Sequence, residues 1–576
     1  MKVIGIKQLT LICFLVIPFT GFGQAFLTES PSAKHWADSV ARKLSRKQKI
    51  AQLMVIRVSE LQNDSVVFFE KQLQKDIRKY NIGALCLFQG AAKQQALVLN
   101  KLQKEAKTPL MVCVDGETGL GMRFSDVEAF PNQLTIGATN QPKLAYAVGE
   151  AIAKQCLRAG IQVNYAPVVD INNNPANPII NVRSFGENKE KVALFGVQMM
   201  KGMQDFGVMA CAKHFPGHGD VSVDSHLDLP VILKSKAQLN DLEFYPFKKM
   251  IAAGVGSMMV AHLYIPAIDT TKNQATSLSY KNVTQLLKEE LNFKGITFTD
   301  ALEMKGVAKF YPQGKAATQS LIAGNDMLCL PGDIKGSIKD VRKAIRKKKL
   351  SWDNIDAKVN KVLLAKYNLK LNKFSPIDTN HIAADLNSNI ETIKTKIYQQ
   401  AITLLKQDTA LRLPLTSNKK IAYVGFGISS ENKLAKLLKD NFSADCFYFD
   451  YQSSGAKADS LMAKLYNNYD IVVSGLHQYQ KRPANNFGIS SAALALFNNL
   501  ATQSKTISLV FGSPYVMDRI MGAKNMLACY EDDALMQQVA FDFLTGLTSA
   551  KGILPVSVSK EFTYGSGIVN PSNKIF

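Results

Sequence analysis

The chain has 576 residues, of which 47% are hydrophobic and 20% are charged, and its formal net charge is +22. A chain of this length is too long to fold around one ordinary hydrophobic core, so we predict two or three domains. The composition is that of a folded globular protein, which excludes a disordered or fibrous chain.

The first 23 residues have the pattern of a secretory signal peptide. Two lysines precede an apolar run from Leu9 to Phe19, and the glycines at positions 21 and 23 offer a cleavage site before Gln24. This run is too short for a good membrane span, and no later apolar run reaches membrane length. We therefore expect an exported protein, periplasmic or secreted, without a membrane span.

The positive charge is scattered, apart from the basic run at residues 346–349, which is typical of a helix end or a solvated face. For an exported protein, this charge favours an anionic cell-wall polymer over nucleic acid. Most cysteines lie in apolar runs and are expected to be buried thiols rather than a disulfide framework, whereas Cys446 and Cys529 could pair. The buried thiols are expected at Cys86, Cys113, Cys156, Cys211 and Cys329.

From residue 34 to about 370, short apolar runs alternate with amphipathic segments. Eight strands, each followed by a helix, predict a (β/α)8 barrel of the TIM type, and continuous apolar strands suit a parallel sheet buried on both faces. The strands are predicted at Gln52–Val58, Ile82–Phe88, Leu110–Asp115, Val163–Asp170, Val208–Ala212, Gly256–His262, Gly295–Thr299 and Asp326–Leu330. The helices are predicted at Lys71–Tyr80, Lys93–Glu105, Lys143–Ala159, Lys189–Phe206, Leu239–Ala253, Asn282–Leu291, Gly314–Ala323 and, as the eighth, Trp352–Leu369.

A second, smaller α/β domain is predicted after a polar connector at residues 372–380. It begins with a helix over Ile390–Leu405 and continues with a parallel sheet. Its strands are predicted at Ile421–Gly425, Cys446–Phe449, Asp470–Ser474, Thr506–Phe511 and Met526–Tyr530. We therefore divide the chain into a signal peptide (1–23), a barrel (24–385) and an α/β sandwich domain (386–576).

Polar side chains follow several barrel strands at their C-terminal ends. Active sites of such barrels lie on this rim. One aspartate after a strand could simply cap the next helix, but six such residues favour a common site. They are Asp115, Asp170, Lys213, His214, His262 and Asp300.

The loop after Val208–Ala212 concentrates ionisable side chains, since three of the seven histidines fall within thirteen residues. Asp224 and His226 stand at positions i and i+2, so in extended backbone both side chains leave on the same face. The carboxylate could then fix the imidazole tautomer and leave the other ring nitrogen free to transfer a proton. His218 and Asp220 are expected only to shape the loop.

Four segments of the barrel region occur in a recognisable order: Asp115–Phe124, Asn177–Gly186, Lys213–Gly219 followed by Asp224–His226, and Phe298–Met304. Together they resemble glycoside hydrolase family 3, specifically its β-N-acetylglucosaminidase (β-N-acetylhexosaminidase) branch. The region after residue 386 resembles the C-terminal α/β sandwich of the same family.

The resemblance implies a retaining hydrolase that removes non-reducing terminal β-linked N-acetylglucosamine. Asp300 would attack the anomeric carbon to form a covalent glycosyl-enzyme, and His226, oriented by Asp224, would act as the acid/base. No metal or cofactor is implied, and the expected partner is a carbohydrate. The expected substrate-binding residues are Asp115, Arg123, Arg183, Lys213 and His214.

Other functions fit the same residues. A histidine acid does not repel phosphate as a carboxylate would, so phosphorolysis stays open, as does a β-glucosidase. A zinc hydrolase could use the types of side chain found at His218, Asp220, Asp224 and His226. A non-catalytic protein that binds cell-wall glycan is the remaining alternative. The natural substrate, whether muropeptide, chitooligosaccharide or glycan fragment, is open.

Overall fold

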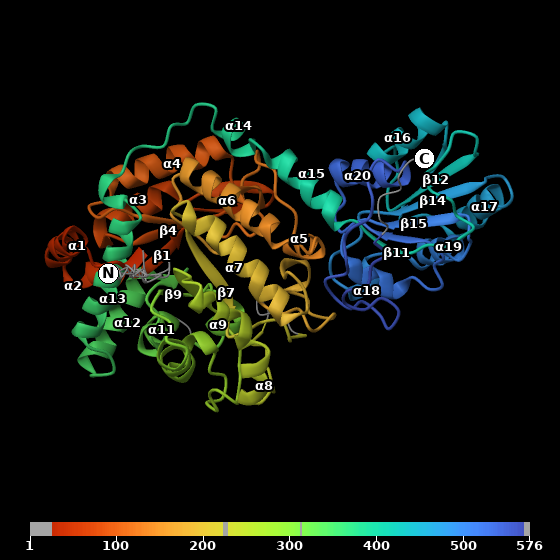
Figure 1. The fold of residues 1–576 in the computed structure, drawn as a ribbon. Coiled ribbons are helices and arrows are strands. Elements are labelled where there is room, and N and C mark those ends of the chain that lie inside the picture. Colours follow the sequence, from red (N-terminus) through yellow and green to blue (C-terminus); the bar gives the residue numbers. More distant parts are fainter. Residues whose placement is uncertain (1–25, 223–227, 312–313, 570–576) are drawn as a thin grey trace, which may run out of the picture.

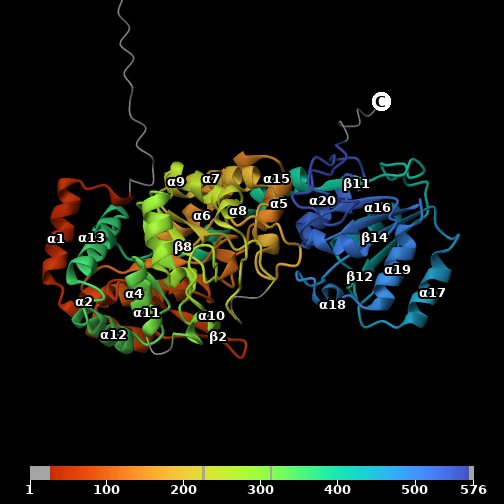
Figure 2. The ribbon, with the colours of Figure 1, turned by 90° about the horizontal axis from the view of Figure 1, so that it is seen from below.

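The computed structural model describes residues 26–222, 228–311 and 314–569. It places two sheets side by side, joined by α14 (Ile382–Asn387) and α15 (Ile390–Ala401), as Figures 1 and 2 show. The predicted boundary between residues 385 and 386 falls inside α14 and stays a prediction. The predicted signal peptide lies outside the described residues, among which no helix is long and apolar enough to cross a membrane.

The first sheet has eight parallel strands in the described part of the chain, in the order β10-β1-β4-β5-β6-β7-β8-β9. A bridge between Phe298 and Met327 joins its two edges and closes the barrel. The predicted (β/α)8 fold is therefore confirmed. The strands are β1 (Met54–Arg57), β4 (Ala84–Leu87), β5 (Met111–Val114), β6 (Val163–Asn164), β7 (Met209–Phe215), β8 (Ser257–Val260), β9 (Ile296–Thr299) and β10 (Leu328–Cys329).

Helices surround the barrel because its strands are apolar on both faces. Every residue of β4, β5, β7, β8 and β9 is buried. This explains why β4 and β5 are continuous apolar runs without alternating polar residues. The helices are α1 (Pro31–Lys43), α2 (Arg46–Ala51), α3 (Glu70–Tyr80), α4 (Ala92–Glu105), α5 (Gln133–Ala138), α6 (Pro142–Arg158), α7 (Lys189–Asp205), α8 (Lys236–Asp241), α9 (Phe244–Ala252), the π-helix η5 (Lys281–Glu290), α10 (Lys305–Ala308), α11 (Lys315–Ala323), α12 (Ile334–Arg346) and α13 (Trp352–Asn368).

The barrel contains three features that the sequence analysis did not predict. A hairpin of β2 (Ser59–Gln62) and β3 (Ser65–Phe68) follows β1, and its two-residue turn has positive φ at both positions, as a tight hairpin turn requires. The helix after β10 is α12 rather than α13, which was predicted as the eighth barrel helix. The predicted helix over Leu239–Ala253 is divided into α8 and α9.

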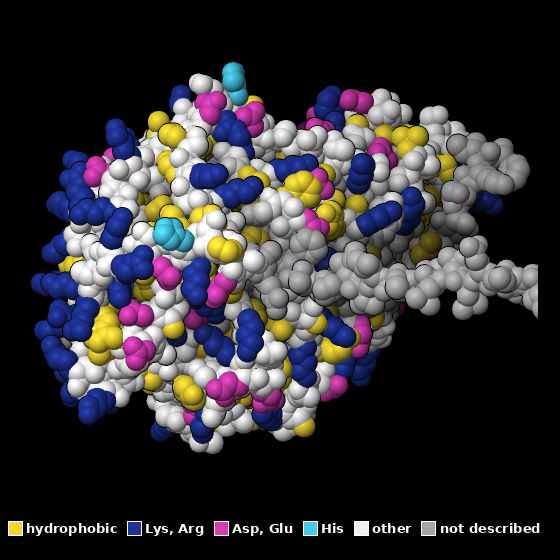
Figure 3. Space-filling model, turned by 60° about the vertical axis from the view of Figure 1, so that its left-hand side comes forward, with side chains coloured by type: hydrophobic (Ala, Val, Ile, Leu, Met, Phe, Trp, Pro, Cys, Tyr) yellow, Lys and Arg dark blue, Asp and Glu magenta, His cyan; other side chains and the backbone are white. Residues whose placement is uncertain are grey.

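The basic run at residues 346–349 ends α12 and is exposed, as expected for a helix end. In Figure 3, Lys and Arg side chains are spread over the visible face with Asp and Glu between them, and they are densest along its left-hand edge. The positive charge is therefore dispersed on this face rather than gathered into one stripe.

The second sheet has six strands in the described residues, in the order β11-β16-β15-β14-β12-β13. The helix predicted over Ile390–Leu405 is wrong in its last part, because α15 ends at Ala401. The segment Thr403–Leu405 lies in β11, which pairs antiparallel with β16, so the sheet is mixed rather than wholly parallel. The strands are β11 (Thr403–Lys406), β12 (Ile421–Phe426), β13 (Asp445–Phe449), β14 (Ile471–Leu476), β15 (Thr506–Val510) and β16 (Met526–Ala528). The helices are α16 (Lys433–Phe442), α17 (Gly455–Leu465), α18 (Ala484–Phe487), α19 (Ser491–Ala501) and α20 (Ala534–Leu544).

The two cysteines of the second domain lie far apart. Cys446 is in β13 and Cys529 directly follows β16, and three strands separate β13 from β16. Four strand spacings correspond to about 19 Å, well beyond the Cα separation of a disulfide. Both are free thiols, as are the other cysteines of the described residues.

Candidate active site

A cavity of about 340 Å³ lies at the C-terminal ends of the barrel strands. It brings together every predicted catalytic or substrate-binding residue that the structure describes. Asp224 and His226 lie outside the described residues. The predicted residues that line the cavity are Asp115, Arg123, Arg183, Lys213, His214 and Asp300.

The fold explains how residues that are distant in sequence meet here. Asp115 directly follows β5, Lys213 and His214 lie near the end of β7, and Asp300 directly follows β9. The carboxyl ends of parallel barrel strands meet on one rim, so these side chains converge. The two arginines come from the loops after β5 and β6, where short 3₁₀ turns place them beside the same rim.

Lys213 is at the centre of a buried array of alternating charges. Its Nζ lies 2.5 Å from Asp115 Oδ1 and 2.6 Å from Glu117 Oε1, and the residue is 1% exposed. Arg123 Nη2 lies 2.8 Å from Asp115 Oδ2. Arg183 donates two hydrogen bonds to Glu117, from Nε at 2.9 Å and from Nη2 at 2.6 Å. Each carboxylate therefore lies between two cations, as buried charges require.

The array stays charged near neutral pH. Burial raises the pKa of Asp115, but Lys213 and Arg123 outweigh burial and hold it below the ordinary value. For the same reason Arg183 and Lys213 hold the pKa of Glu117 far below its usual range. Burial lowers the pKa of Lys213, but its two carboxylates reverse this effect and raise it. Such fixed donors and acceptors are suited to the hydroxyl and acetamido groups of a sugar.

The sequence analysis assigned no role to Glu117, although it lies in the segment Asp115–Phe124. The sequence feature that could have indicated a role for Glu117 is its spacing of two residues from Asp115. In extended backbone, this spacing directs both carboxylates to one side. The structure shows Glu117 to be 3% exposed and paired with Lys213 and Arg183.

His214 is held in one tautomer by its neighbours. Its Nδ1 lies 2.7 Å from Asp170 Oδ2, and its Nε2 lies 3.2 Å from Arg183 Nη2. A guanidinium can only donate, so Nε2 accepts and the proton is on Nδ1, where it is donated to Asp170. Both ring nitrogens of His214 are therefore engaged within the protein, and its predicted role in substrate binding stays a prediction.

Asp300, the predicted nucleophile, lines the cavity directly after β9. Its Oδ1 accepts a hydrogen bond of 2.8 Å from the amide of Ala301. Burial raises the pKa of Asp300, but His262, His214 and the Ala301 amide outweigh burial, so the pKa lies below its ordinary value. The carboxylate is therefore ionised near neutral pH, as a nucleophile must be.

His262 supports the segment that carries Asp300. Its Nε2 donates to the carbonyl of Ala301 at 3.0 Å, and its Nδ1 lies 2.6 Å from Ser277 Oγ. The sequence analysis placed His262 on the rim without a role, and the structure shows it buried behind the Asp300 segment.

The two loop residues His218 and Asp220 differ in position. Asp220 forms an ion pair with Lys234 at 2.8 Å, consistent with shaping the loop. His218 also shapes the loop through its backbone amide, which donates to Asp170 at 2.7 Å. Its ring, however, lines the cavity, is 2% exposed, and has no hydrogen-bond partner within the described residues. The cluster of three histidines marked this loop as functional, but the sequence did not show that the His218 ring faces the cavity.

The buried ring of His218 is expected to make the protein less stable in mild acid. Burial, aided by His214, lowers the pKa of His218 to about 4, so between pH 6.5 and 4 the unfolded chain binds a proton that the folded chain does not. Its contribution to the free energy of unfolding is intact above pH 6.5 and falls by roughly 2–3 kcal/mol by pH 4.5.

Urea unfolding at pH 7 and pH 4.5 measures this difference. His218→Phe should lose this part of the pH dependence, whereas the control His35→Gln, at an exposed position of α1, should retain it. An unchanged pH dependence in His218→Phe would show that the imidazole is protonated within the fold.

The second domain holds the loop after β6, which carries Arg183. Asn172 Nδ2 donates to the hydroxyl of Tyr515 at 2.5 Å. At the other end of the loop, Ser557 donates from its amide and its hydroxyl to the carboxylate of Glu187, at 2.6 and 2.7 Å. Part of the charged array around Lys213 is therefore supported from outside the barrel.

A (β/α)8 barrel with a charged cavity on the carboxyl rim of its strands defines the class of TIM-barrel enzymes. The profile of the "Glycosyl hydrolase family 3 N terminal domain" matches residues 45–365, and the chain belongs to this family. The family predicted from the four sequence segments is thereby confirmed.

The similar proteins agree with the predicted branch. A beta-hexosaminidase A of Pseudoalteromonas piscicida is 33% identical over 386 residues, which cover 61% of this chain and 64% of that relative, less than two thirds of its length. A beta-hexosaminidase of Neisseria meningitidis serogroup B is 32% identical over 274 residues, which cover 45% of this chain and 74% of the relative. The solved structure of a family 3 beta-N-acetylglucosaminidase from Paenibacillus superimposes with a TM-score of 0.74 at 27% identity, over 90% of this chain and 99% of the other.

Proposed function

We propose that the protein is a retaining glycosidase that removes non-reducing terminal β-linked N-acetylglucosamine. The observation that carries this proposal is the ionised Asp300 in one cavity with the sugar-binding charges around Lys213. The names of the beta-hexosaminidase relatives and of the Paenibacillus structure support the choice of sugar.

In this mechanism Asp300 attacks the anomeric carbon and displaces the leaving-group oxygen, which takes a proton from the His226 imidazolium. Water then attacks the glycosyl-aspartate, neutral His226 accepts its proton, and Asp300 is released as a carboxylate. Two displacements at one carbon retain the configuration. Asp224 is assigned to orient His226.

The other acidic residues that line the cavity are paired with cations. This supports the proposal that the proton donor lies outside the described residues. Asp115 lies between Lys213 and Arg123, which hold its pKa low. Glu303, the remaining acidic residue that lines the cavity, forms an ion pair with Arg57. Because cations already engage both carboxyl groups, His226 is the better candidate for the acid.

We also propose that the protein is exported to the periplasm or beyond and acts in peptidoglycan turnover. The basic and apolar pattern of the first 23 residues supports export. The dispersed positive charge supports contact with an anionic cell-wall polymer.

A panel of aryl β-glycosides tests the proposed activity. We expect kcat/KM for the N-acetylglucosaminide to exceed that for the glucoside by about 10²-fold or more. A glucoside has no acetamido group, so the hydrogen-bond donors of the site that would bind this group are left unpaired. NMR should show release of the β-anomer, and added phosphate should yield no sugar 1-phosphate. A glucoside cleaved equally fast, or a sugar phosphate as the main product, would contradict the proposal.

A further inference from the structure

Although Lys and Arg are spread over much of the face in Figure 3, α12 exposes a row of lysines. Residues 334–349 include eight lysines and arginines and one acidic residue. Lys335, Lys339, Lys343 and Lys347 follow one another at intervals of four, all are exposed, and none forms an ion pair with another described residue. Because residues four apart are neighbours on a helix, these side chains form one line, which we call the lysine row.

The helix dipole explains only the end of the lysine row. Cations stabilise the C-terminal end of a helix, but this effect is confined to the last turn. Lys335 lies in the first turn of α12 and Lys339 in the second, and like charges four residues apart destabilise a helix. Asp340, the one acidic residue of the segment, forms no ion pair with a described residue. The row therefore makes the helix less stable, which suggests a role outside the fold.

Further cations extend the row at its C-terminal end. Lys348 and Lys349 follow directly and are exposed, and α2, which packs against α12, exposes Arg46 and Lys47. The Arg46 guanidinium lies over the ring of Trp352, 5.0 Å from the ring centre, which places it close to the end of the basic run. We call the lysine row and these four residues the basic surface.

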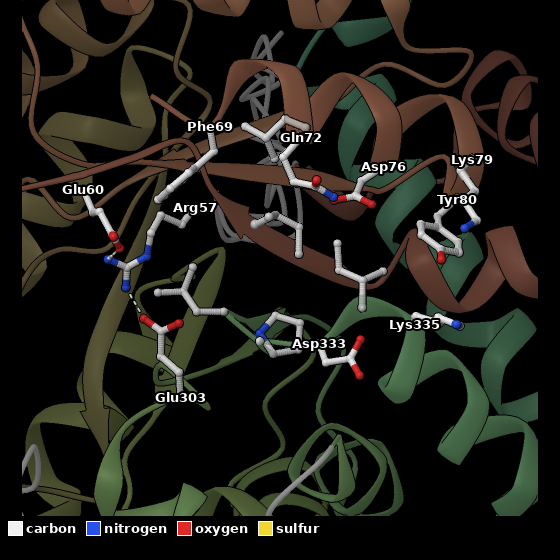
Figure 4. A pocket seen from close by; sticks show the side chains of 16 residues that line it. Arg57, Glu60, Phe69, Gln72, Asp76, Lys79, Tyr80, Glu303, Asp333 and Lys335 are labelled. Atoms are coloured by element: carbon white, nitrogen blue, oxygen red, sulfur yellow. Dashed lines mark hydrogen bonds and ion pairs between the residues drawn. The ribbon is translucent and has the colours of Figure 1, made fainter. Parts of the chain in front are cut away.

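The basic surface lies outside the catalytic cavity. Because α12 follows β10, the row begins near the rim of the barrel and extends along its flank for about 20 Å. Figure 4 shows a second cavity, which shares Arg57 and Glu303 with the first, and Lys335 lies at the opposite end from both. Figures 1 and 2 place α2 at the end of the molecule away from the second domain. A ligand on this surface leaves the cavity around Lys213 free for the sugar.

The chemistry of the surface suits a hydrated polymer that carries repeated negative charge. Neighbouring lysines of the row are about 6 Å apart along the helix axis. A helix that inserts into a lipid surface needs exposed apolar side chains, and a site for single-stranded nucleic acid needs exposed aromatic rings. Among the described residues 31–51 and 334–356, no large apolar side chain is exposed. The basic surface therefore favours a polyanionic glycan over lipid or nucleic acid.

We propose that the basic surface docks the protein onto peptidoglycan, whose carboxylates contact the lysine row. This rests on the proposed action in the cell wall. The contact holds the enzyme on the polymer while the separate catalytic cavity meets the ends of its glycan chains. The unpaired charge of the row, its position outside the cavity and the lack of exposed apolar side chains carry the inference.

Cosedimentation with purified peptidoglycan sacculi tests the surface. We expect the wild-type protein to bind at low salt and to be released at high salt, because salt screens exposed charges. The triple variant Lys339→Gln/Lys343→Gln/Lys347→Gln should bind more weakly by about tenfold or more, since a field of one sign concentrates an oppositely charged ligand. Sacculi with amidated carboxylates should bind the wild-type protein as weakly as untreated sacculi bind this variant.

Three exposed lysines on other elements provide a matched control. Lys143→Gln/Lys433→Gln/Lys464→Gln removes the same charge from α6, α16 and α17 and should bind sacculi like the wild-type protein. Both triple variants should hydrolyse an aryl N-acetylglucosaminide at the wild-type rate, because none of the six lysines lines the catalytic cavity. This rate reports that each variant is folded and active.

The outcomes separate the docking surface from the proposed activity. Equal binding by the two triple variants, or undiminished binding to amidated sacculi, overturns the proposal. Row-dependent binding to vesicles of anionic phospholipid without binding to sacculi assigns the surface to a membrane and also overturns it. A wild-type protein that binds sacculi through the row but does not hydrolyse the aryl substrate contradicts the proposed activity and supports the docking surface.

Discussion

Asp300→Ala is expected to abolish turnover, with kcat lower by about 10⁴-fold or more, as for other catalytic nucleophiles. The carboxylate follows β9 on the rim, outside the packed interior of the barrel, so its removal takes away the attacking group and leaves the fold intact. The rate of aryl N-acetylglucosaminide hydrolysis measures the loss. Circular dichroism and thermal unfolding check the fold.

A trapping experiment separates the nucleophile from a structural carboxylate. A fluorinated N-acetylglucosamine analogue with an activated leaving group should label the peptide that contains Asp300, as mass spectrometry would detect. Asp326→Asn is not a suitable control, because Asp326 pairs with Lys288 and Lys361 inside the barrel. Glu303→Gln, which retains size at a neighbouring position, should still be labelled at Asp300. A label on another carboxylate would refute the assignment.

His226→Ala is expected to slow both chemical steps, but to a degree that depends on the leaving group. A nitrophenolate needs little protonation, so the variant should keep much of its rate of glycosyl-enzyme formation on that substrate. A sugar leaving group needs a full proton, and its loss should be about 10²–10⁴-fold, the usual contribution of a general acid. Pre-steady-state kinetics on both substrates measure the two losses.

Azide distinguishes a catalytic histidine from a structural one. In His226→Ala, hydrolysis of the glycosyl-enzyme becomes limiting, and azide should partly restore turnover by forming a glycosyl azide. Asp224→Asn should show a milder form of the same behaviour, because the imidazole remains but its tautomer is less well fixed. Equal losses on both leaving groups without azide rescue would assign the proton to another residue.

The barrel could be predicted because its strands are buried on both faces and end in polar residues. β5 illustrates this, since its continuous apolar run, Met111–Val114, stops at Asp115. β11 could not be predicted in this way. Its apolar residues directly follow the amphipathic α15, and only pairing with β16, more than a hundred residues away, makes that segment a strand.

The candidate site could be predicted as single residues but not as a charged array. Lys213 and Arg183 were expected to bind sugar, yet their pairing with Glu117 depends on two loops and the end of β7, which meet only in the fold. The neutral state of His218 also depends on burial and on the nearby ring of His214, whose centre is 5.8 Å away. Such environments follow from tertiary packing, which spacing in the sequence does not encode.

The contacts from Tyr515 and Ser557 to the loop after β6 make the position of Arg183 depend on both domains. If a ligand engages Arg183 and orders this loop, it must strengthen the domain interface by the same free energy with which the interface favours the ligand, because such coupling is reciprocal. Substitutions of Tyr515 or Ser557 can therefore alter binding at Arg183 without changing the barrel. Evolution of this enzyme could adjust its affinity there while leaving the reacting groups unchanged.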